Sequence, residues 1–599
     1  MRRKRIKERL LRVLEKAPPL KEIMLSSETV ESKRSKIRRF LSDKLVETFD
    51  DNPQIPPLEW ILTRDAITVF RNLLSTRSEE RAGYSFLQYL DDLLHRENLK
   101  GMERPQSGFY EEIDHLLRGI TGQTNVYSET KPAFLKYEGR RAAKLRSADL
   151  SRMTRMAKRT MDRYPCGLDD DVIRERSVNK ARILQHFGAT ELEWEDWKWH
   201  VGHTIRDAKT LKSLVKLTKE ENQAVKLANE FRLPFGITPY YLSLMDHEPG
   251  RHKDYAVRAQ VIPTLRYVNK MKEFRDRAEP SMDFMLERDT SPVEGITRRY
   301  PMIVILKPVI TCPQICVYCQ RNWELEDVTT CDVATPTKKL EKAIQWIEET
   351  TEINEVLVTG GDPFLLPNDR IENVLFRLSR IEHIERIRLG TRTPVTLPQR
   401  VTDALVRDIS HFQHPGRREV IIVTHFEHPY EITPQAMQAI QRFRRYGMEV
   451  YNQLVYTFHN SRRFEAALLR HKLRLIGVTP YYTFNTKGKE ETDDYRVPIA
   501  RLLQEQHEEA RLMPGTVRTD EIVFNVPRLG KNYLRAKQHH DIISILPDGR
   551  RVYEFHPWEK QLFLVDTYVH KDVSIHDYLG RLKEAGEDIT DYKTIWYYY

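Results

Sequence analysis

Three cysteines lie close together in the segment TCPQICVYC, where Cys312, Cys316 and Cys319 form a C-x3-C-x2-C pattern. The whole chain of 599 residues has only five cysteines, so chance is a poor explanation for this grouping. Thiolates at such spacing suit a [4Fe-4S] cluster, which normally takes four cysteine ligands. With three ligands, one iron stays open and can bind a cofactor.

The competing interpretation is a zinc site or a set of scattered structural thiols. A zinc site normally needs four ligands, and no further cysteine stands at a matching spacing. Cys331 follows Cys319 by twelve positions and has no partner near it in the sequence. The spacing therefore favours the iron–sulfur cluster.

From about residue 300 the chain alternates between short apolar strands and amphipathic helices. The predicted strands are MIVILKPVI, EVLVTG, RIRLGT, EVIIVTH, EVYNQLVYT and RLIGVTPYY. Buried parallel strands have this composition. Six such units predict an α/β fold with a partial (β/α)6 barrel of the TIM type, in which chemistry lies at the carboxyl ends of the strands. The cysteines follow the first strand, where a catalytic cluster should lie.

Length and composition bound the rest of the chain. A chain this long should form two to four domains. No apolar run approaches the roughly 18 residues that span a bilayer, and the basic start MRRKRIKERLLRVLEK lacks the apolar core of a secretory signal. Few cysteines suit a reducing compartment, so we expect a cytoplasmic protein. The net charge of +10 permits nucleic-acid binding without demonstrating it, and also favours an anionic substrate.

A second motif, Gly360-Gly361-Asp362-Pro363, follows the second predicted strand. Two glycines let the backbone approach a ligand closely. Alone, the motif could be an ordinary turn between a strand and a helix. One strand after the cysteines, it favours a binding role.

The cysteine pattern, with Tyr318 before the last cysteine, resembles the radical S-adenosylmethionine (SAM) enzymes, in which the open iron chelates SAM. Further motifs resemble the lysine 2,3-aminomutase family in the same order: SPVEGITRRYP, VTGGDPFLL, LGTRTPVTLPQR, VTHFEHPYEIT, YNQLVYT, VTPYYTF and DYRVP. The resemblance covers residues 190 to about 560 and leaves out residues 1–190. It implies an isomerase that uses SAM and pyridoxal 5′-phosphate (PLP), moves an amino group from C2 to C3, and takes an electron from a donor such as flavodoxin or ferredoxin.

The resemblance also implies which residues serve the cofactors. The PLP lysine matches Lys531, at the end of the run Asn525–Lys531; this run is one residue shorter than the family's glycine-rich run, which leaves Lys537 as a second candidate. Arg299 and Tyr300 match positions that hold PLP, and an arginine fork suits a phosphate dianion. The positions that match residues near SAM or PLP are Tyr318, Gly360, Gly361, Asp362, His425 and Gln453.

Substrate binding is predicted from three positions. Arg321 matches the arginine that binds the substrate α-carboxylate, for which a bidentate guanidinium is the natural partner. Lysine-specific members hold the distal ammonium with two aspartates, and Lys487 and Asn525 stand at those positions here. A cation and an amide would instead suit a distal carboxylate. The pair predicts conversion of L-glutamate to β-glutamate.

Other interpretations fit the same residues. Lys489, Asp493 and Asp494 lie close to Lys487 in sequence, so a shifted alignment would restore L-lysine or another amino acid as the substrate. A third hypothesis is a mutase that acts on a residue within a macromolecule. The basic N-terminal region would then bind RNA or protein. A degenerate relative that only binds ligands is a fourth, against which the complete motifs argue.

The sequence thus predicts four segments: a helical region over 1–189, a helical arm over 190–298, the barrel over 299–500, and a small strand-containing extension with the PLP lysine over 501–599. Since only Cys166 and Cys331 remain beyond the cluster motif, we expect no structural zinc. We expect a homo-oligomer, a small amino acid as ligand, and neither membrane nor nucleic acid as partner.

Overall fold

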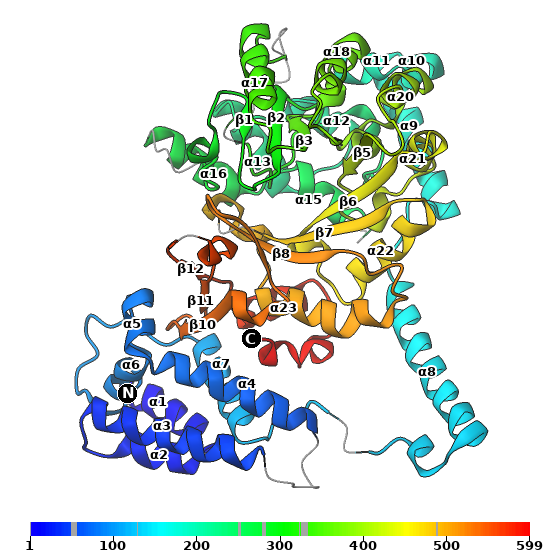
Figure 1. The fold of residues 1–599 in the computed structure, drawn as a ribbon. Helices are drawn as coiled ribbons and strands as arrows, with labels where there is room; N and C mark the ends of the chain where they lie inside the picture. Colours follow the sequence, from blue (N-terminus) through cyan, green and yellow to red (C-terminus); the bar gives the residue numbers. More distant parts are fainter. Residues whose placement is uncertain are drawn as a thin grey trace. The chain divides into compact units, whose positions relative to one another are not determined.

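The computed structural model describes residues 2–49, 57–127, 130–248, 253–277, 283–322, 324, 334–486, 489–562 and 564–599 (Figure 1). The chain forms two compact units. Unit 1 comprises Met1–Lys158, Val497–Glu509 and Asn532–Tyr599, and unit 2 comprises Arg159–Arg496 and Ala510–Lys531. The four segments predicted above follow the order of the motifs along the chain and stay a prediction.

A parallel sheet forms the centre of unit 2. Its strands are β2 (Ile303–Val309), β3 (Glu355–Gly360), β4 (Arg386–Gly390), β5 (Glu419–Thr424), β6 (Glu449–Tyr456), β7 (Thr479–Asn485) and β8 (Glu521–Val526). Neighbours in this order pair in parallel. The short β1 (Ile296–Thr297) pairs antiparallel with β2, and β9 (Gly530–Tyr533) follows β8 at the other edge. The predicted α/β class and the partial barrel are confirmed.

One strand differs from the prediction. The segment EIVFNV, expected in the strand-containing extension, is β8 and pairs in parallel with β7 through Tyr482, Thr483 and Phe484. The parallel part therefore has seven strands instead of six. A buried apolar strand has the same pattern in either sheet, so composition alone could not place it.

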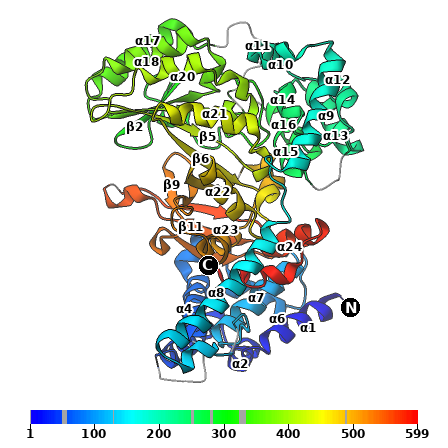
Figure 2. The ribbon, with the colours of Figure 1, turned by 90° about the vertical axis from the view of Figure 1, so that its right-hand side faces the viewer.

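Amphipathic helices follow the strands of unit 2 and lie along the sheet (Figure 2). They are α17 (Thr337–Glu349), α18 (Asn368–Ser379), α20 (Asp403–Ser410), α21 (Pro434–Arg445) and α22 (Glu465–Leu475). In α18 the buried side chains Ile371, Val374, Leu375 and Leu378 recur at spacings of three and four, which gives the helix one apolar face toward the sheet. This packing fixes the loops at the carboxyl ends of the strands.

The predicted arm forms a set of shorter helices that also belongs to unit 2: α10 (Glu191–Glu195), α11 (Trp197–Gly202), α12 (Ala208–Leu214), α13 (Lys219–Glu230), α14 (Pro239–Leu242), α15 (Tyr255–Val261) and α16 (Leu265–Asp276). The longer α9 (Asp170–Phe187) belongs to unit 2 as well, although it lies in the predicted region 1–189. Val317, inside the cysteine loop, packs with Tyr267 of α16 and with Tyr495 in one apolar cluster. Its backbone N–H also donates to the Gln260 carbonyl. The arm therefore supports the cysteine loop directly.

Unit 1 combines both ends of the chain. Its helices are α1 (Arg2–Leu14), α2 (Pro18–Leu25), α3 (Val30–Glu47), α4 (Pro57–Leu73), α5 (Thr76–Ala82), α6 (Phe86–His95), α7 (Ser107–Ile120), α23 (Ile499–Gln504) and α24 (Ile575–Glu584), and α8 (Gly139–Met161) ends in unit 2. A three-stranded antiparallel sheet of β10 (His540–Ile545), β11 (Arg551–Phe555) and β12 (Tyr568–Lys571) packs with α4 and α5. Within the described residues, no helix has the length and apolar character needed to cross a membrane.

Candidate active site

The two glycines at the end of β3 hold the loop that carries the first cysteine. Gly361 donates its N–H to the Val309 carbonyl at 2.9 Å, and Asp362 donates to the Thr311 carbonyl at 3.0 Å. A Cβ on Gly361 would lie 2.0 Å from the Thr311 carbonyl oxygen. Gly360 has φ +112°, and a Cβ there would lie 2.7 Å from the Val309 carbonyl oxygen. Glycine is thus required at both positions because the end of β3 presses against the strand end that leads to Cys312.

Replacing Gly361 with alanine should therefore disturb the cysteine loop. Overpacking of backbone against backbone typically destabilises a protein by about 1–3 kcal/mol, and the strain would fall on the segment just before Cys312. We expect a lower melting temperature and less iron per chain after anaerobic reconstitution. Gly202→Ala is the matched control, since a Cβ on Gly202 meets no atom within 4 Å. Full iron content in G361A would contradict this account of the glycines.

The three cysteines of the motif meet as free thiols at this end of the sheet. All three are partly exposed, and Cys312 and Cys319 pack against Ile315. Burial, together with the neighbouring cysteines, raises the pKa of the Cys312 and Cys316 thiols, while the Arg392 guanidinium opposes this shift at Cys316. Among the described residues, no three His, Cys, Asp or Glu side chains lie close enough together to hold one metal ion. A cluster does not require that, because each of its cysteines binds a different iron; the donor set fits a [4Fe-4S] cluster.

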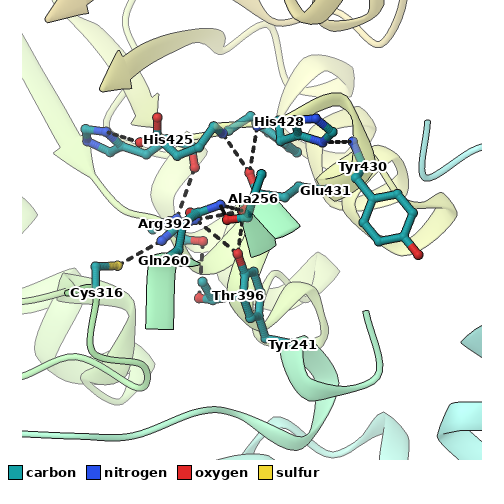
Figure 3. A network of polar contacts seen from close by, with 12 residues as sticks. Tyr241, Ala256, Gln260, Cys316, Arg392, Thr396, His425, His428, Tyr430 and Glu431 are labelled. Atoms are coloured by element: carbon teal, nitrogen blue, oxygen red, sulfur yellow. Dashed lines mark hydrogen bonds and ion pairs between the residues drawn. The ribbon is translucent and has the colours of Figure 1, made fainter. Parts of the chain in front are cut away.

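Arg392 belongs to this site although the sequence did not predict it. It follows β4 in the segment LGTRTP, and its guanidinium donates to Cys316 Sγ at 2.8 Å and to the Glu431 carboxylate at 2.7 Å (Figure 3). Its Nε donates to the His425 carbonyl, and Gln260 accepts another N–H. A buried cation against a cysteine ligand stabilises thiolate and suits an anionic cofactor group. The sequence feature that could have identified Arg392 is its position just after the carboxyl end of a predicted strand.

Two of the residues predicted to lie near SAM or PLP, Asp362 and Tyr318, are held by hydrogen bonds to other protein groups. The Asp362 carboxylate is buried and accepts from Thr391 Oγ1 and from the backbone N–H groups of Phe364, Arg392 and Thr393. It therefore ties the ends of β3 and β4 together. Tyr318 donates its hydroxyl to Gln260 Oε1 at 3.1 Å.

The histidine after β5 is held in its uncharged form. Burial and the nearby Arg392 lower the pKa of His425 to about 4, so its ring is neutral at physiological pH. Gln453 lies on β6 at a register shift, where it pairs with Tyr482 of β7. A neighbour that the sequence did not flag, Glu427, is buried, and burial raises the pKa of its carboxyl to about 8.

Lys531 lies against two tyrosine side chains. Its backbone N–H donates to Tyr300 Oη at 2.7 Å, and its Nζ lies 3.4 Å from the same hydroxyl. The Nζ also faces the rings of Tyr300 and Tyr482, with centroids at 4.6 and 4.8 Å. Gly530, at φ +99°, permits this contact because a Cβ there would lie 2.6 Å from Tyr300 Oη. Thus the predicted PLP lysine and Tyr300 lie together.

Lys531 has the electrostatic environment of a reactive amine. Burial and the nearby guanidinium groups of Arg388 and Arg299 lower the pKa of Lys531 to about 8. A lysine whose amine is partly neutral near pH 8 can attack a carbonyl carbon. In contrast Lys537, the second candidate, is exposed and paired with Asp65 at 2.8 Å.

Arg299 and Arg321 share one buried carboxylate. Arg321 donates through Nε and Nη2 to Glu287 at 3.0–3.2 Å, while Arg299 Nη2 lies 3.9 Å from Glu287. Arg299 Nε and Nη2 are buried without a hydrogen-bond partner in the described part of the chain. Such orphaned donors are costly unless a ligand satisfies them, so Arg299 fits the phosphate of PLP.

The substrate-specificity positions are only partly described. Lys487 lies outside the described residues. Asn525 lies on β8 and is half-buried. Lys489, the other lysine of this loop, is buried and committed to protein groups: its Nζ donates to Asn322 Oδ1 at 2.8 Å and pairs with Glu491 at 2.6 Å.

Comparison with known proteins places this site in a family. The radical SAM superfamily model matches residues 306–469, from β2 into α22. The chain is 42% identical, over 97% of its length and 96% of the relative's, to an uncharacterized KamA family protein of Methanocaldococcus jannaschii. The chain belongs to the KamA family. This KamA-family protein is therefore a radical SAM enzyme, and the superfamily implies a [4Fe-4S] cluster and SAM.

The KamA-family chain is also similar to proteins named as 2,3-aminomutases. It is 34% identical to the glutamate 2,3-aminomutase of Clostridioides difficile, over 57% of this chain and 76% of that protein. It is 33% identical to the L-lysine 2,3-aminomutase of Fusobacterium nucleatum, over 53% of this chain and 70% of that protein. The relation to the lysine and glutamate 2,3-aminomutases is thereby established.

Proposed function

We propose that the protein is a SAM- and PLP-dependent 2,3-aminomutase, an isomerase that moves the α-amino group of L-glutamate to C3 and forms β-glutamate. The observation that carries the proposal is the charge pattern around Lys531 and Arg321, in which Glu287, Glu355 and Glu324 are each already paired with a cation. An external electron donor would reduce the cluster.

The pairing of the described carboxylates supports an acidic substrate. Glu287 pairs with Arg321, Glu355 with Arg388, Glu324 with Lys307, and Glu491 with Lys489. Asp493 and Asp494, the acids that lie close to Lys487 in the sequence, pair with Arg266 of α16. A substrate ammonium would have to displace one of these cations. At the buried pairs Glu287–Arg321 and Glu491–Lys489, removing one partner costs about 3–5 kcal/mol. A substrate carboxylate needs no such exchange.

The cofactor residues support the PLP part of the proposal. Lys531 would hold PLP through its amine, Arg299 would bind the phosphate, and Arg321 would bind the substrate α-carboxylate. When bound, the cluster with SAM supplies a carbon radical and PLP delocalises the substrate radical. The protein's own residues would bind and orient the substrate: Arg321 at the α-carboxylate, and Lys487 and Asn525 at the distal carboxylate.

The test is anaerobic incubation of the reconstituted protein with SAM, PLP and a reductant, separately with L-glutamate and L-lysine. We expect β-glutamate and no β-lysine. β-Lysine without β-glutamate would support the lysine relatives and overturn the substrate assignment. Deoxyadenosine without either product would point to another amino acid. A C319A variant, which lacks one thiolate, is the control for background chemistry.

A further inference from the structure

Glu287 is a buried carboxylate with a fixed position. It is 1% exposed, and its Oε1 accepts from Thr297 Oγ1 of β1 at 2.9 Å. The carboxylate of Asp283 accepts the backbone N–H groups of Glu287 and Arg288 at 2.9 and 3.0 Å, which closes the turn just before the short helix Arg288–Thr290. Both the backbone and the side chain of Glu287 are therefore tied down.

The charge of Glu287 is maintained by its neighbours. Burial opposes ionisation, but nearby cations, Arg321 first among them, outweigh it and lower the pKa of the carboxyl to about 2. Arg321, itself only 8% exposed, directs Nε and Nη2 to this carboxylate. A charge-assisted fork of this kind fixes the plane of the guanidinium as well as its place.

One edge of Arg321 is open among the described residues. With Nε and Nη2 committed to Glu287, its Nη1 makes no hydrogen bond to any group in the described ranges. An arginine side chain has many rotamers, and a site that fixes one of them before the ligand arrives loses less entropy on binding.

We propose that Glu287 is a positioning residue that holds Arg321 in the one orientation in which its free edge meets the substrate α-carboxylate. This inference rests on the proposed function for the role of Arg321. It goes beyond that function because it assigns Glu287 a role in substrate binding. Glu287 carries the same charge as the substrate carboxylate, yet in this account it favours binding. The opposite hypothesis is that Glu287 occupies the carboxylate site and must be displaced.

The experiment measures ligand binding as well as turnover by the full-length, cluster- and PLP-loaded protein. The variants are Glu287→Gln, which keeps the shape and one acceptor oxygen, and the control Glu294→Gln, an exposed acid of the same segment that pairs with Lys339. Each is titrated calorimetrically with L-glutamate and with γ-aminobutyrate, which lacks the α-carboxylate. L-Lysine and cadaverine form the second matched pair.

Positioning predicts that Glu287→Gln weakens binding of the amino acid about tenfold, as expected for one misplaced charge-assisted contact. Binding of the decarboxylated analogue and the PLP content should stay unchanged, and KM should rise more than kcat falls. Glu294→Gln should match the wild type in the binding of both ligands, in PLP content, in KM and in kcat.

Three results would overturn the inference. Tighter binding of the amino acid to Glu287→Gln would show that Glu287 competes with the substrate. An equal loss of affinity for the amino acid and for its decarboxylated analogue, or a loss of bound PLP, would show that Glu287 has only a structural role. Failure of the wild type to bind either amino acid would remove the carboxylate site itself. Binding with the predicted pattern but without any β-amino product would leave this inference intact and overturn only the proposed function.

Discussion

Replacing Lys531 with alanine is expected to remove covalent attachment of PLP and to lower aminomutase activity more than about 100-fold, the scale of loss when a reacting group is no longer held in place. The reason is that Lys531 is buried beside two aromatic rings and has a pKa lowered to about 8. Its amine can therefore act as a nucleophile near neutral pH. Borohydride reduction of the PLP-loaded protein followed by peptide mapping measures the attachment.

Lys537→Ala is the matched control, because Lys537 is the alternative lysine and is exposed beside Asp65. It should keep both the label and the activity. The attachment rate of the wild type should also increase from pH 7 to pH 9, since deprotonation through about pH 8 creates the neutral amine. A label on Lys537, or a rate that rises only near the ordinary lysine pKa of about 10.4, would contradict the assignment.

The second large effect concerns Cys316. Replacing it with alanine removes one of three thiolates and leaves the buried Arg392 guanidinium without its sulfur partner. We expect loss of most of the iron, loss of the charge-transfer absorbance of the cluster, and no deoxyadenosine from SAM under reducing conditions. Cluster binding depends on every thiolate ligand when only three are present.

Cys166→Ala serves as the control for Cys316. Cys166 is a buried free thiol of unit 2 that precedes α9, far from the motif in the sequence. This variant should retain iron and SAM cleavage. Retained iron and deoxyadenosine formation in C316A would contradict the assignment of the three cysteines, while loss in both variants would point to general instability.

The sequence predicted the parts of the site that depend on local spacing. The cysteines, the glycine pair and the strand that precedes each of them are short-range patterns, and the structure has them in the expected order. Lys531 and Tyr300 came from the family resemblance, and the structure places them in contact although they are far apart in the chain.

Partners that meet across long separations could not be predicted. Glu287 and Arg321 are an ordinary acid and an ordinary base in the sequence, and only the fold pairs them. The same holds for Arg392 beside Cys316, and for Lys489, which the sequence left free to bind substrate but which Glu491 and Asn322 hold. Burial and pairing are properties of the packed chain and leave no local pattern.

The two ends of the chain illustrate the same limit at the level of the fold. Apolar periodicity predicted the helices of the N-terminal region and strands near the C-terminus, yet it carried no signal that they pack together in unit 1. One such pair is Glu112 of α7 and Arg551 of β11, which form a buried ion pair at 3.0 Å. Pairing of this kind depends on complementary surfaces, which hydrophobic patterns do not encode.

The most direct test of the central claim follows the amino nitrogen itself. The reconstituted protein is given L-glutamate labelled with 13C at every carbon and with 15N on the amine, and one-bond carbon–nitrogen coupling is recorded by NMR. The account predicts that the coupling moves from C2 to C3 in a product that retains both carboxylates. Coupling that stays on C2 while deoxyadenosine accumulates, or migration seen only with labelled L-lysine, would contradict it.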